Sequence, residues 1–238
     1  MEQAEKRILI TGASGAFGEA IARRFSAAGY ELLLHAHAGK LAHLSGAQTI
    51  TGDLRRQADL DALIDVIEKK PVDGFIHAAS VPVVTENFLE TDEANLREQL
   101  DVALLAFAAL ARACAKRMRE RGGGSIVAIL SGYVMGLPPA RMASYVTAKH
   151  ALLGLAKALS AELGAYHIRV NAISPSLADT PFSSAVPAPY KKLLANQTPL
   201  RRLCTPEDVA STAFFLCSQD ASFITGANIP LTGGLSMH

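Results

Sequence analysis

The sequence predicts an α/β fold, with one doubly wound parallel sheet of about seven strands flanked by helices. Short apolar runs alternate with segments of helical periodicity along the whole chain, as in a parallel sheet covered on both faces. The first apolar run stops at a glycine-rich loop that leads into a helix. The 238 residues, half of them hydrophobic, suit one domain with a substantial core, so we expect residues 1–238 to form a single domain.

The expected strands are short apolar runs, because strands buried on both faces read as continuous hydrophobic segments. In chain order they are Arg7–Thr11, Glu31–His35, Ala47–Gly52, Val72–Ala79, Ser125–Leu130, Ile168–Ile173 and Asn228–Leu231. The expected helices repeat apolar residues at helical spacing. They are Gly18–Ala28, Asp59–Lys69, Asn95–Arg119, Ala143–Leu163 and Pro206–Ser218. Gly29 is typical of a helix end, and Thr205 before Pro206 is typical of a helix start.

One segment, residues 174–206, departs from this alternation. It is polar, rich in proline and long for a connection within a compact domain. Such insertions often form lids or binding loops, so we expect this one to set the substrate. Phe182, Val186 and Tyr190 are candidates for an apolar lining, or alternatively for packing within the lid itself.

Composition excludes several classes of function. The formal net charge of +1 gives no electrostatic argument for binding nucleic acid. No apolar stretch reaches the roughly 20 residues of a membrane helix, and the charged N-terminus does not read as a signal peptide. The three cysteines are far apart, which favours reduced thiols and a cytoplasmic location. The seven histidines form no cluster with zinc spacing, so no metal site is expected.

Tyr145 and Lys149 are the first candidate catalytic pair. They lie four residues apart, which places both side chains on one face of the expected helix. A tyrosine titrates near pH 10, and a neighbouring ammonium lowers its pKa by stabilising the phenolate. This pairing suits acid–base chemistry, although the spacing also recurs by chance in surface helices.

A glycine-rich loop, Thr11–Gly18, lies between the first strand and the first helix. Small residues there let the backbone approach a pyrophosphate, which the amide hydrogens of the helix N-terminus then bind. A tight strand–helix turn without a ligand would have a similar sequence. Asp53, after the third strand, also has two interpretations: a helix N-cap, or a carboxylate bonded to an adenine amine.

Together with four later segments, these residues resemble the short-chain dehydrogenase/reductase family over nearly the whole chain, and most resemble its 3-oxoacyl-carrier-protein reductases. The later segments are Ile168–Pro175, Thr198–Arg202, Pro206–Val209 and Ile224–Gly234. The resemblance implies a Rossmann-like domain that binds a nicotinamide cofactor and reduces a carbonyl. It also implies that the helices near residues 95–119 and 143–163, which carry alanine-rich faces, pair subunits into a homotetramer.

The resemblance assigns roles to individual residues. Tyr145 would donate a proton to the carbonyl oxygen, Lys149 would bond the nicotinamide ribose, and Ser131 would orient the carbonyl. Tyr145 and Lys149 are both also expected among the cofactor-binding residues. The carboxamide of the cofactor would be held by Pro175, Ala178 and Thr180. The other cofactor-binding residues expected from the resemblance are Gly12, Ser14, Gly15, Phe17, Gly18, His35, Asp53, Leu54, Ala78 and Ala79.

The chain departs from the family pattern at four places. Ala16 replaces the middle glycine of the loop, and His77–Ser80 replaces an Asn-Asn-Ala-Gly segment. Ala103 falls where a helical asparagine is usual. Gly132 has the usual spacing of the serine, so Ser131 reaches the site only if the following loop has gained one residue. An alternative hypothesis is therefore a catalytically weakened member that serves as a binding or partner subunit.

The end of the second strand bears on the choice of cofactor. Family members that use NAD usually carry an aspartate there, whereas this chain has His35, His37 and Lys40, which can attract a 2′-phosphate. The sequence thus predicts NADP(H), with NAD(H) possible, and an NADPH-dependent reduction of a 3-oxoacyl thioester or similar carbonyl. The substrate would be a small molecule or a carrier-protein-bound acyl group. An NAD-dependent alcohol or sugar dehydrogenase is the remaining alternative.

Overall fold

The computed structural model describes residues 6–39, 41 and 43–236 and contains one seven-stranded sheet. All six strand pairs are parallel. The strand order is β3-β2-β1-β4-β5-β6-β7, so the chain runs from the centre to one edge and then returns to build the other half. The bounds are β1 Arg7–Thr11, β2 Glu31–Ala36, β3 Gln48–Thr51, β4 Gly74–His77, β5 Gly124–Ile129, β6 Ile168–Pro175 and β7 Asn228–Leu231. The predicted fold class is confirmed.

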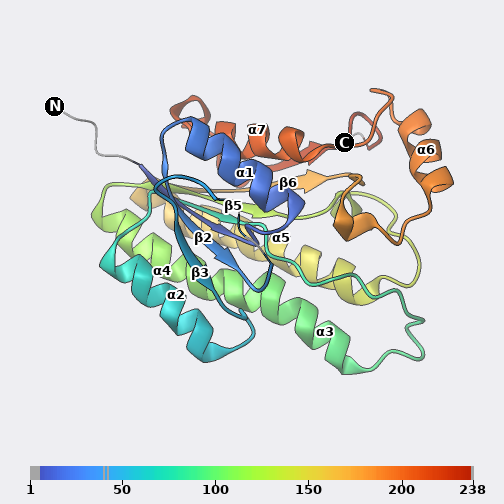
Figure 1. Ribbon diagram of the computed structural model, residues 1–238, viewed down its shortest axis with the longest axis horizontal. Coiled ribbons are helices and arrows are strands. Elements are labelled where there is room, and N and C mark those ends of the chain that lie inside the picture. The colour runs from blue at the N-terminus through green and yellow to red at the C-terminus, as the bar shows by residue number, and fades with distance from the viewer. Residues whose placement is uncertain (1–5, 40, 42, 237–238) are drawn as a thin grey trace.

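Helices cover both faces of the sheet (Figure 1). Helices α1 and α7 pack on one face, and α2, α4 and α5 pack on the other. The bounds are α1 Ala16–Ala27, α2 Gln57–Lys69, α3 Glu93–Leu100, α4 Ala106–Glu120, α5 Ala143–Leu163, α6 Ala188–Gln197 and α7 Pro206–Cys217. Five short helical turns complete the described chain: η1 Asp101–Leu105, η2 Gly132–Val134, η3 Gly164–Tyr166, η4 Pro181–Ser183 and η5 Gln219–Ala221.

The alternation of side chains along each strand divides the core into two layers. On β1, Leu9 faces the α2/α4/α5 layer, whereas Ile8 and Ile10 face the α1/α7 layer. Phe107 of α4 and Phe25 of α1 are fully buried against these two faces. Each such side chain contributes about 1.5–3 kcal/mol of transfer free energy, which fixes the sheet between its helices.

Several boundaries differ from those expected. Helix α1 begins at Ala16 rather than Gly18, with Gly15 as its N-cap. The helix expected over residues 95–119 is two α-helices joined by a π-helical turn, η1. Residues 174–206 are not loop throughout, since they contain η4 and α6. The prolines of α6 lie in its first turn, where a missing N–H is tolerated, so they do not break the helix.

The candidate site lies where the strand order reverses. The carboxyl ends of β1 and β4 are adjacent at Thr11 and His77, and β5 ends beside them at Ile129. In open parallel sheets, this edge at the switch point holds the ligand.

Candidate functional site

The glycine loop is shaped by two close backbone contacts. A Cβ on Gly12, whose φ is +70°, would lie 2.6 Å from the backbone nitrogen of Ala79. A Cβ on Gly18 would lie 2.2 Å from the carbonyl oxygen of Gly12. Gly15 is different, because its Cβ would meet only the Gly12 oxygen, at 3.4 Å. Steric contacts thus require glycine at positions 12 and 18, whereas at position 15 they do not.

The start of α1 fits a pyrophosphate. Gly15 is exposed and provides no side-chain cap, so the first amide hydrogens of the helix keep their bonding capacity and the positive end of its dipole. The Ser14 hydroxyl does not cap the helix, since it donates a hydrogen bond to the Ala38 carbonyl at 2.9 Å. Phe17 packs against the α1/α7 core. Ala16 is the first residue of the helix, so its methyl group leaves the two essential glycine contacts unchanged.

His35 does not provide a positive charge at the end of β2. Only 2% of its surface is exposed, and its Nε2 lies 3.0 Å from the Gly52 carbonyl oxygen. Burial lowers the pKa of His35, so the ring is neutral near pH 7. The expectation that a charged His35 attracts a 2′-phosphate is therefore wrong. His37 is the exposed histidine at this end of the strand, with 65% of its side chain accessible; Lys40 lies outside the described residues.

Asp53 is held as a carboxylate by Arg55. Nε of Arg55 lies 2.9 and 3.1 Å from its two oxygens, and Nη2 lies 2.7 Å from one of them. These hydrogen bonds hold the pKa of Asp53 at about 2. The N-cap interpretation is wrong, because α2 begins at Gln57 after Arg56 as its N-cap. Leu54, the next expected contact, is buried beside Asp53.

Tyr145 and Lys149 lie on the buried face of α5, as their spacing predicted. They are 8% and 4% exposed, and Lys149 Nζ lies 5.7 Å from the centre of the Tyr145 ring. Lys149 donates a hydrogen bond to the Ile129 carbonyl at 3.0 Å, which ties α5 to the end of β5.

Ser131 completes a three-residue cluster. It follows β5, its hydroxyl accepts from the Tyr133 amide at 3.3 Å, and it lies near enough to the Tyr145 phenol to oppose the rise in that group's pKa. A Cβ on Gly132 would instead point toward the Pro175 carbonyl, at 3.3 Å. The structure therefore brings Ser131, and not position 132, to Tyr145.

The pKa values of the pair differ from the expectation. Burial raises the pKa of Tyr145 to about 12, with Ser131 opposing the rise and Tyr133 adding to it. Burial also lowers the pKa of Lys149 to about 8. The expected lowering of the tyrosine pKa by Lys149 is absent, because the ammonium is directed at Ile129 and the phenolate would lose its hydration. Near neutral pH, Tyr145 is a protonated phenol that can donate.

The segment after β6 forms a tight turn around a residue that sequence reasoning missed. Ser183 is buried, donates to the Ala178 carbonyl at 2.6 Å, and accepts from the Thr180 amide at 3.2 Å. Pro175 and Ala178 are buried, while Thr180 is half-buried. The Thr-x-x-Ser spacing from Thr180 to Ser183 is that of a capping box, and this signal could have identified it.

The second missed residue is His77. It is fully buried and lies within hydrogen-bonding distance of Thr11 Oγ1 (2.8 Å) and of the Val102 carbonyl oxygen (3.1 Å). Ala78 and Ala79 meet the glycine loop through their backbones, since the Ala78 amide donates to the Thr11 carbonyl at 3.1 Å. In this chain the segment therefore contacts the glycine loop both through its backbone and through the His77 side chain.

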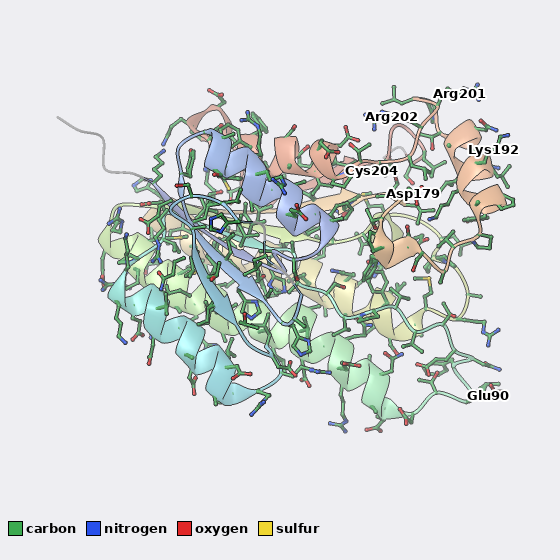
Figure 2. The ribbon with its side chains drawn as sticks, viewed as in Figure 1. Glu90, Asp179, Lys192, Arg201, Arg202 and Cys204 are labelled. Atoms are coloured by element: carbon green, nitrogen blue, oxygen red, sulfur yellow. The ribbon has the colours of Figure 1, made fainter. Side chains whose placement is uncertain are left out.

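Residues 174–206 place apolar side chains beside the cluster. The Phe182 ring centre lies 6.5 Å from that of Tyr145, and about half of the Phe182 and Tyr190 surfaces is exposed. Val186 is half-buried. Figure 2 shows Asp179, at the start of this turn, and Lys192, on α6; Asp179 pairs with Lys191 at 2.6 Å.

Two further findings concern the described part of the chain. None of its helices is both long and apolar enough to cross a membrane. Within the same residues, no group of three or more His, Cys, Asp or Glu side chains is arranged to hold a metal ion.

Comparison with known proteins gives a consistent set of relatives. Residues 12–236 match the family model described as Enoyl-(Acyl carrier protein) reductase. Human "Dehydrogenase/reductase SDR family member 4" is 32% identical over 244 residues, covering 97% of this chain and 87% of the relative. "Uncharacterized oxidoreductase YmfI" of Bacillus subtilis (strain 168) is 32% identical over 244 residues, covering 96% and 98%.

Two solved structures share the fold. The 3-ketoacyl-(acyl-carrier-protein) reductase of Brucella melitensis complexed with NADH superposes with a TM-score of 0.90 at 28% identity, covering 99% of this chain and 100% of that one. The ligand-free aldohexose dehydrogenase of Thermoplasma acidophilum superposes with a TM-score of 0.87 at 27% identity, covering 97% and 94%.

Proposed function

Because the chain belongs to the short-chain dehydrogenase/reductase family and is an NAD(P)-dependent oxidoreductase, we propose that it uses NADPH to reduce a ketone to an alcohol. The observation that carries this proposal is the buried cluster of Ser131, Tyr145 and Lys149 at the switch point of the sheet. It unites a proton donor, a hydroxyl next to that donor and a cation in one place.

The bound nicotinamide would supply the hydride for this reaction. Tyr145 keeps its proton near neutral pH, because burial raises its pKa, and it donates that proton to the carbonyl oxygen. The Ser131 hydroxyl, beside the phenol, orients the same oxygen. Lys149, held by its hydrogen bond to the Ile129 carbonyl on the same buried face of α5, places its ammonium next to the reacting groups, where it can bond the cofactor ribose.

The residues present fit a dinucleotide. Because Gly12 and Gly18 carry no side chain, the loop can pack tightly against neighbouring backbone. The uncapped start of α1 then fits the pyrophosphate. Asp53, fixed as a carboxylate, suits an adenine amine. Lys149 would bond the ribose, and the turn stabilised by Ser183 would hold the carboxamide through Pro175, Ala178 and Thr180.

We assign the preference for NADPH to His37 rather than His35. His37 is exposed at the end of β2, where it can meet a ribose substituent, and β2 itself ends without a carboxylate that would repel a 2′-phosphate. Asp53 Oδ2 lies 3.9 Å from His37 Nε2, so the two side chains border the same adenosine position.

The substrate we favour is a 3-oxoacyl thioester or a similar carbonyl, either free or attached to a carrier protein. The half-exposed apolar surfaces of Phe182 and Tyr190 support an apolar chain next to Tyr145. The likeness to the Brucella melitensis 3-ketoacyl-(acyl-carrier-protein) reductase supports the same class. The test measures NADPH oxidation with a series of 3-oxoacyl thioesters of increasing chain length and with simple ketones. A rise of kcat/KM with chain length supports the assignment, and equal rates for all carbonyls contradict the acyl assignment.

An NAD-dependent sugar dehydrogenase is the second candidate, favoured by the likeness to the aldohexose dehydrogenase of Thermoplasma acidophilum. It predicts oxidation of aldohexoses with NAD and tighter binding of NAD than of NADP. Comparing the two cofactors by fluorescence titration separates it from the first candidate. A weakened partner subunit predicts no turnover with either substrate class.

We also propose that the enzyme is a homotetramer. Helices α4 and α5 border a surface groove of about 310 Å³ with small and apolar residues on both sides. They include Ala108, Ala111, Leu155, Leu159 and Leu163, and the charged side chains of Arg112, Lys116, Arg119 and Glu162 also line the groove. The alanines do not all face the sheet, so a second copy can approach closely there. Light scattering after size-exclusion chromatography tests this, and a monomer at micromolar concentration contradicts it.

A further inference from the structure

A π-helical turn, η1, joins α3 to α4 next to the end of β4. A π-bulge disturbs the regular i→i−4 pattern of the helix and occurs frequently at functional sites. Here one backbone group of the turn has a partner outside the helix: the Val102 carbonyl oxygen lies 3.1 Å from His77 Nε2. Ala103, the next residue, is buried and has no polar side chain to hold the turn.

The bonding of His77 defines its protonation. A carbonyl oxygen only accepts, so Nε2 carries the hydrogen that is donated to Val102. Nδ1 is then the acceptor for the Thr11 hydroxyl, at 2.8 Å. Burial lowers the pKa of His77 to about 3, the charge of Lys149 acts in the same direction, and the hydrogen bond to the Val102 carbonyl opposes it. His77 is therefore a neutral ring with both nitrogens occupied.

These two bonds connect parts of the site that are far apart in the sequence. Thr11 is the last residue of β1 and directly precedes Gly12, whereas Val102 lies in the turn that packs against α5. Phe75 and Phe107 enclose the His77 ring, with centroid distances of 5.9 and 5.5 Å. The ring thus has one fixed position between the nucleotide loop and the helix that faces Lys149.

We propose that His77 is a positioning residue, which holds the glycine loop and the π-helical turn in register with Lys149 through its hydrogen bonds to Thr11 and Val102. This inference rests on the proposed function, because its effect is expressed through cofactor binding and turnover. It also gives a role to His77–Ser80, the segment that replaces the family's Asn-Asn-Ala-Gly and that would otherwise count against an active enzyme.

The test compares His77→Phe, His77→Gln and wild type. Phenylalanine keeps the ring packing but removes both hydrogen bonds, whereas the glutamine amide keeps a donor for Val102. In His77→Phe we expect kcat to fall by about 10- to 100-fold, as for small misplacements of catalytic groups. We also expect the Kd for NADPH to rise several-fold and the alkaline limb of the kcat–pH profile to shift. His77→Gln should recover most of the lost kcat and most of the lost affinity for NADPH.

Circular dichroism and the Tm show whether each variant is folded. A folded His77→Phe with unchanged kcat, pH profile and NADPH affinity overturns the inference, as does an equal loss in His77→Gln. Should wild type fail to reduce any carbonyl, the proposed function fails. The inference is then decided by NADPH affinity alone, where an unchanged Kd in His77→Phe overturns it and a raised Kd restored by His77→Gln supports it. Should His77→Phe not fold, Thr11→Val removes the hydrogen bond at His77 Nδ1 instead; a lower kcat and a raised Kd for NADPH support the inference, and unchanged values overturn it.

Discussion

Lys149 Nζ lies 5.7 Å from the centre of the Tyr145 ring and donates its hydrogen bond to the Ile129 carbonyl rather than to the phenol. The two side chains share a buried face of α5, yet burial acts on them in opposite directions. It raises the pKa of the phenol to about 12 and lowers the pKa of the ammonium to about 8. The charge of Lys149 is therefore held in place at a cost in stability.

The first prediction concerns that cost. The pKa of Lys149 is about 8 in the folded chain, below its ordinary value of 10.5. Between these two pH values the unfolded chain binds more protons, so the free-energy cost of burying the ammonium falls progressively as pH rises. Lys149→Met removes the effect. We expect the variant to gain stability relative to wild type at pH 7.5, and this advantage to shrink by up to about 3 kcal/mol by pH 10.5. Urea unfolding at both pH values measures it, and a difference independent of pH contradicts it.

The second prediction separates Ser131 from Gly132. Since Ser131 lies beside Tyr145 and acts on its pKa, Ser131→Ala should lower kcat by about 10²- to 10³-fold, the usual effect of deleting a comparable donor. Adding Gly132→Ser to that variant should not restore activity, because a side chain at position 132 points toward Pro175. Recovery in the double variant would contradict the account, because it would show that a hydroxyl at position 132 can reach Tyr145.

The third prediction uses two glycines of the same loop. Gly18→Ala places a methyl carbon 2.2 Å from the Gly12 carbonyl oxygen, whereas Gly15→Ala places one at 3.4 Å. We expect Gly18→Ala to lose NADPH binding and to lower the Tm by several degrees. Gly15→Ala should retain the wild-type Tm within a degree or two, so it serves as the control. Equal behaviour of the two variants in differential scanning fluorimetry and NADPH titration would contradict the steric account.

The fourth prediction concerns the choice of cofactor. His37→Asp places a carboxylate where we expect the 2′-phosphate, so the repulsion should raise KM for NADPH and improve the use of NADH. We expect the ratio of kcat/KM for the two cofactors to change by at least about tenfold. His35→Gln is the control, because His35 is buried and neutral. A larger change in His35→Gln than in His37→Asp would reverse the assignment.

Much of the fold was predictable, because buried parallel strands and amphipathic helices leave distinct periods in the sequence. Helix α6 was missed because its first turn carries prolines and its surface is mostly exposed. The π-helical turn within the helix expected at residues 95–119 was missed for another reason. One extra residue per turn barely changes the apolar period, so only the backbone bonding shows it.

The candidate site was predictable where its residues are close in sequence. The spacing of Tyr145 and Lys149 placed both on one face of a helix, as the structure has them. The burial of side chains such as His35 and His77 could not be predicted from local spacing. His35 was expected to attract a 2′-phosphate, but it is buried in β2 between Thr11 of β1 and Ile50 of β3, and that position depends on the register of the sheet. His77 contacts Thr11 across 66 residues of chain, a distance at which no local pattern operates.

The most direct test of the account is NADPH oxidation with an acetoacetyl thioester by wild type and by Tyr145→Phe. Phenylalanine keeps the buried ring but removes the proton donor. The account predicts turnover by wild type and a loss of about 10²- to 10⁴-fold in the variant, with NADPH affinity unchanged. No turnover by wild type across a panel of carbonyls, or an equal rate in Tyr145→Phe, would contradict it.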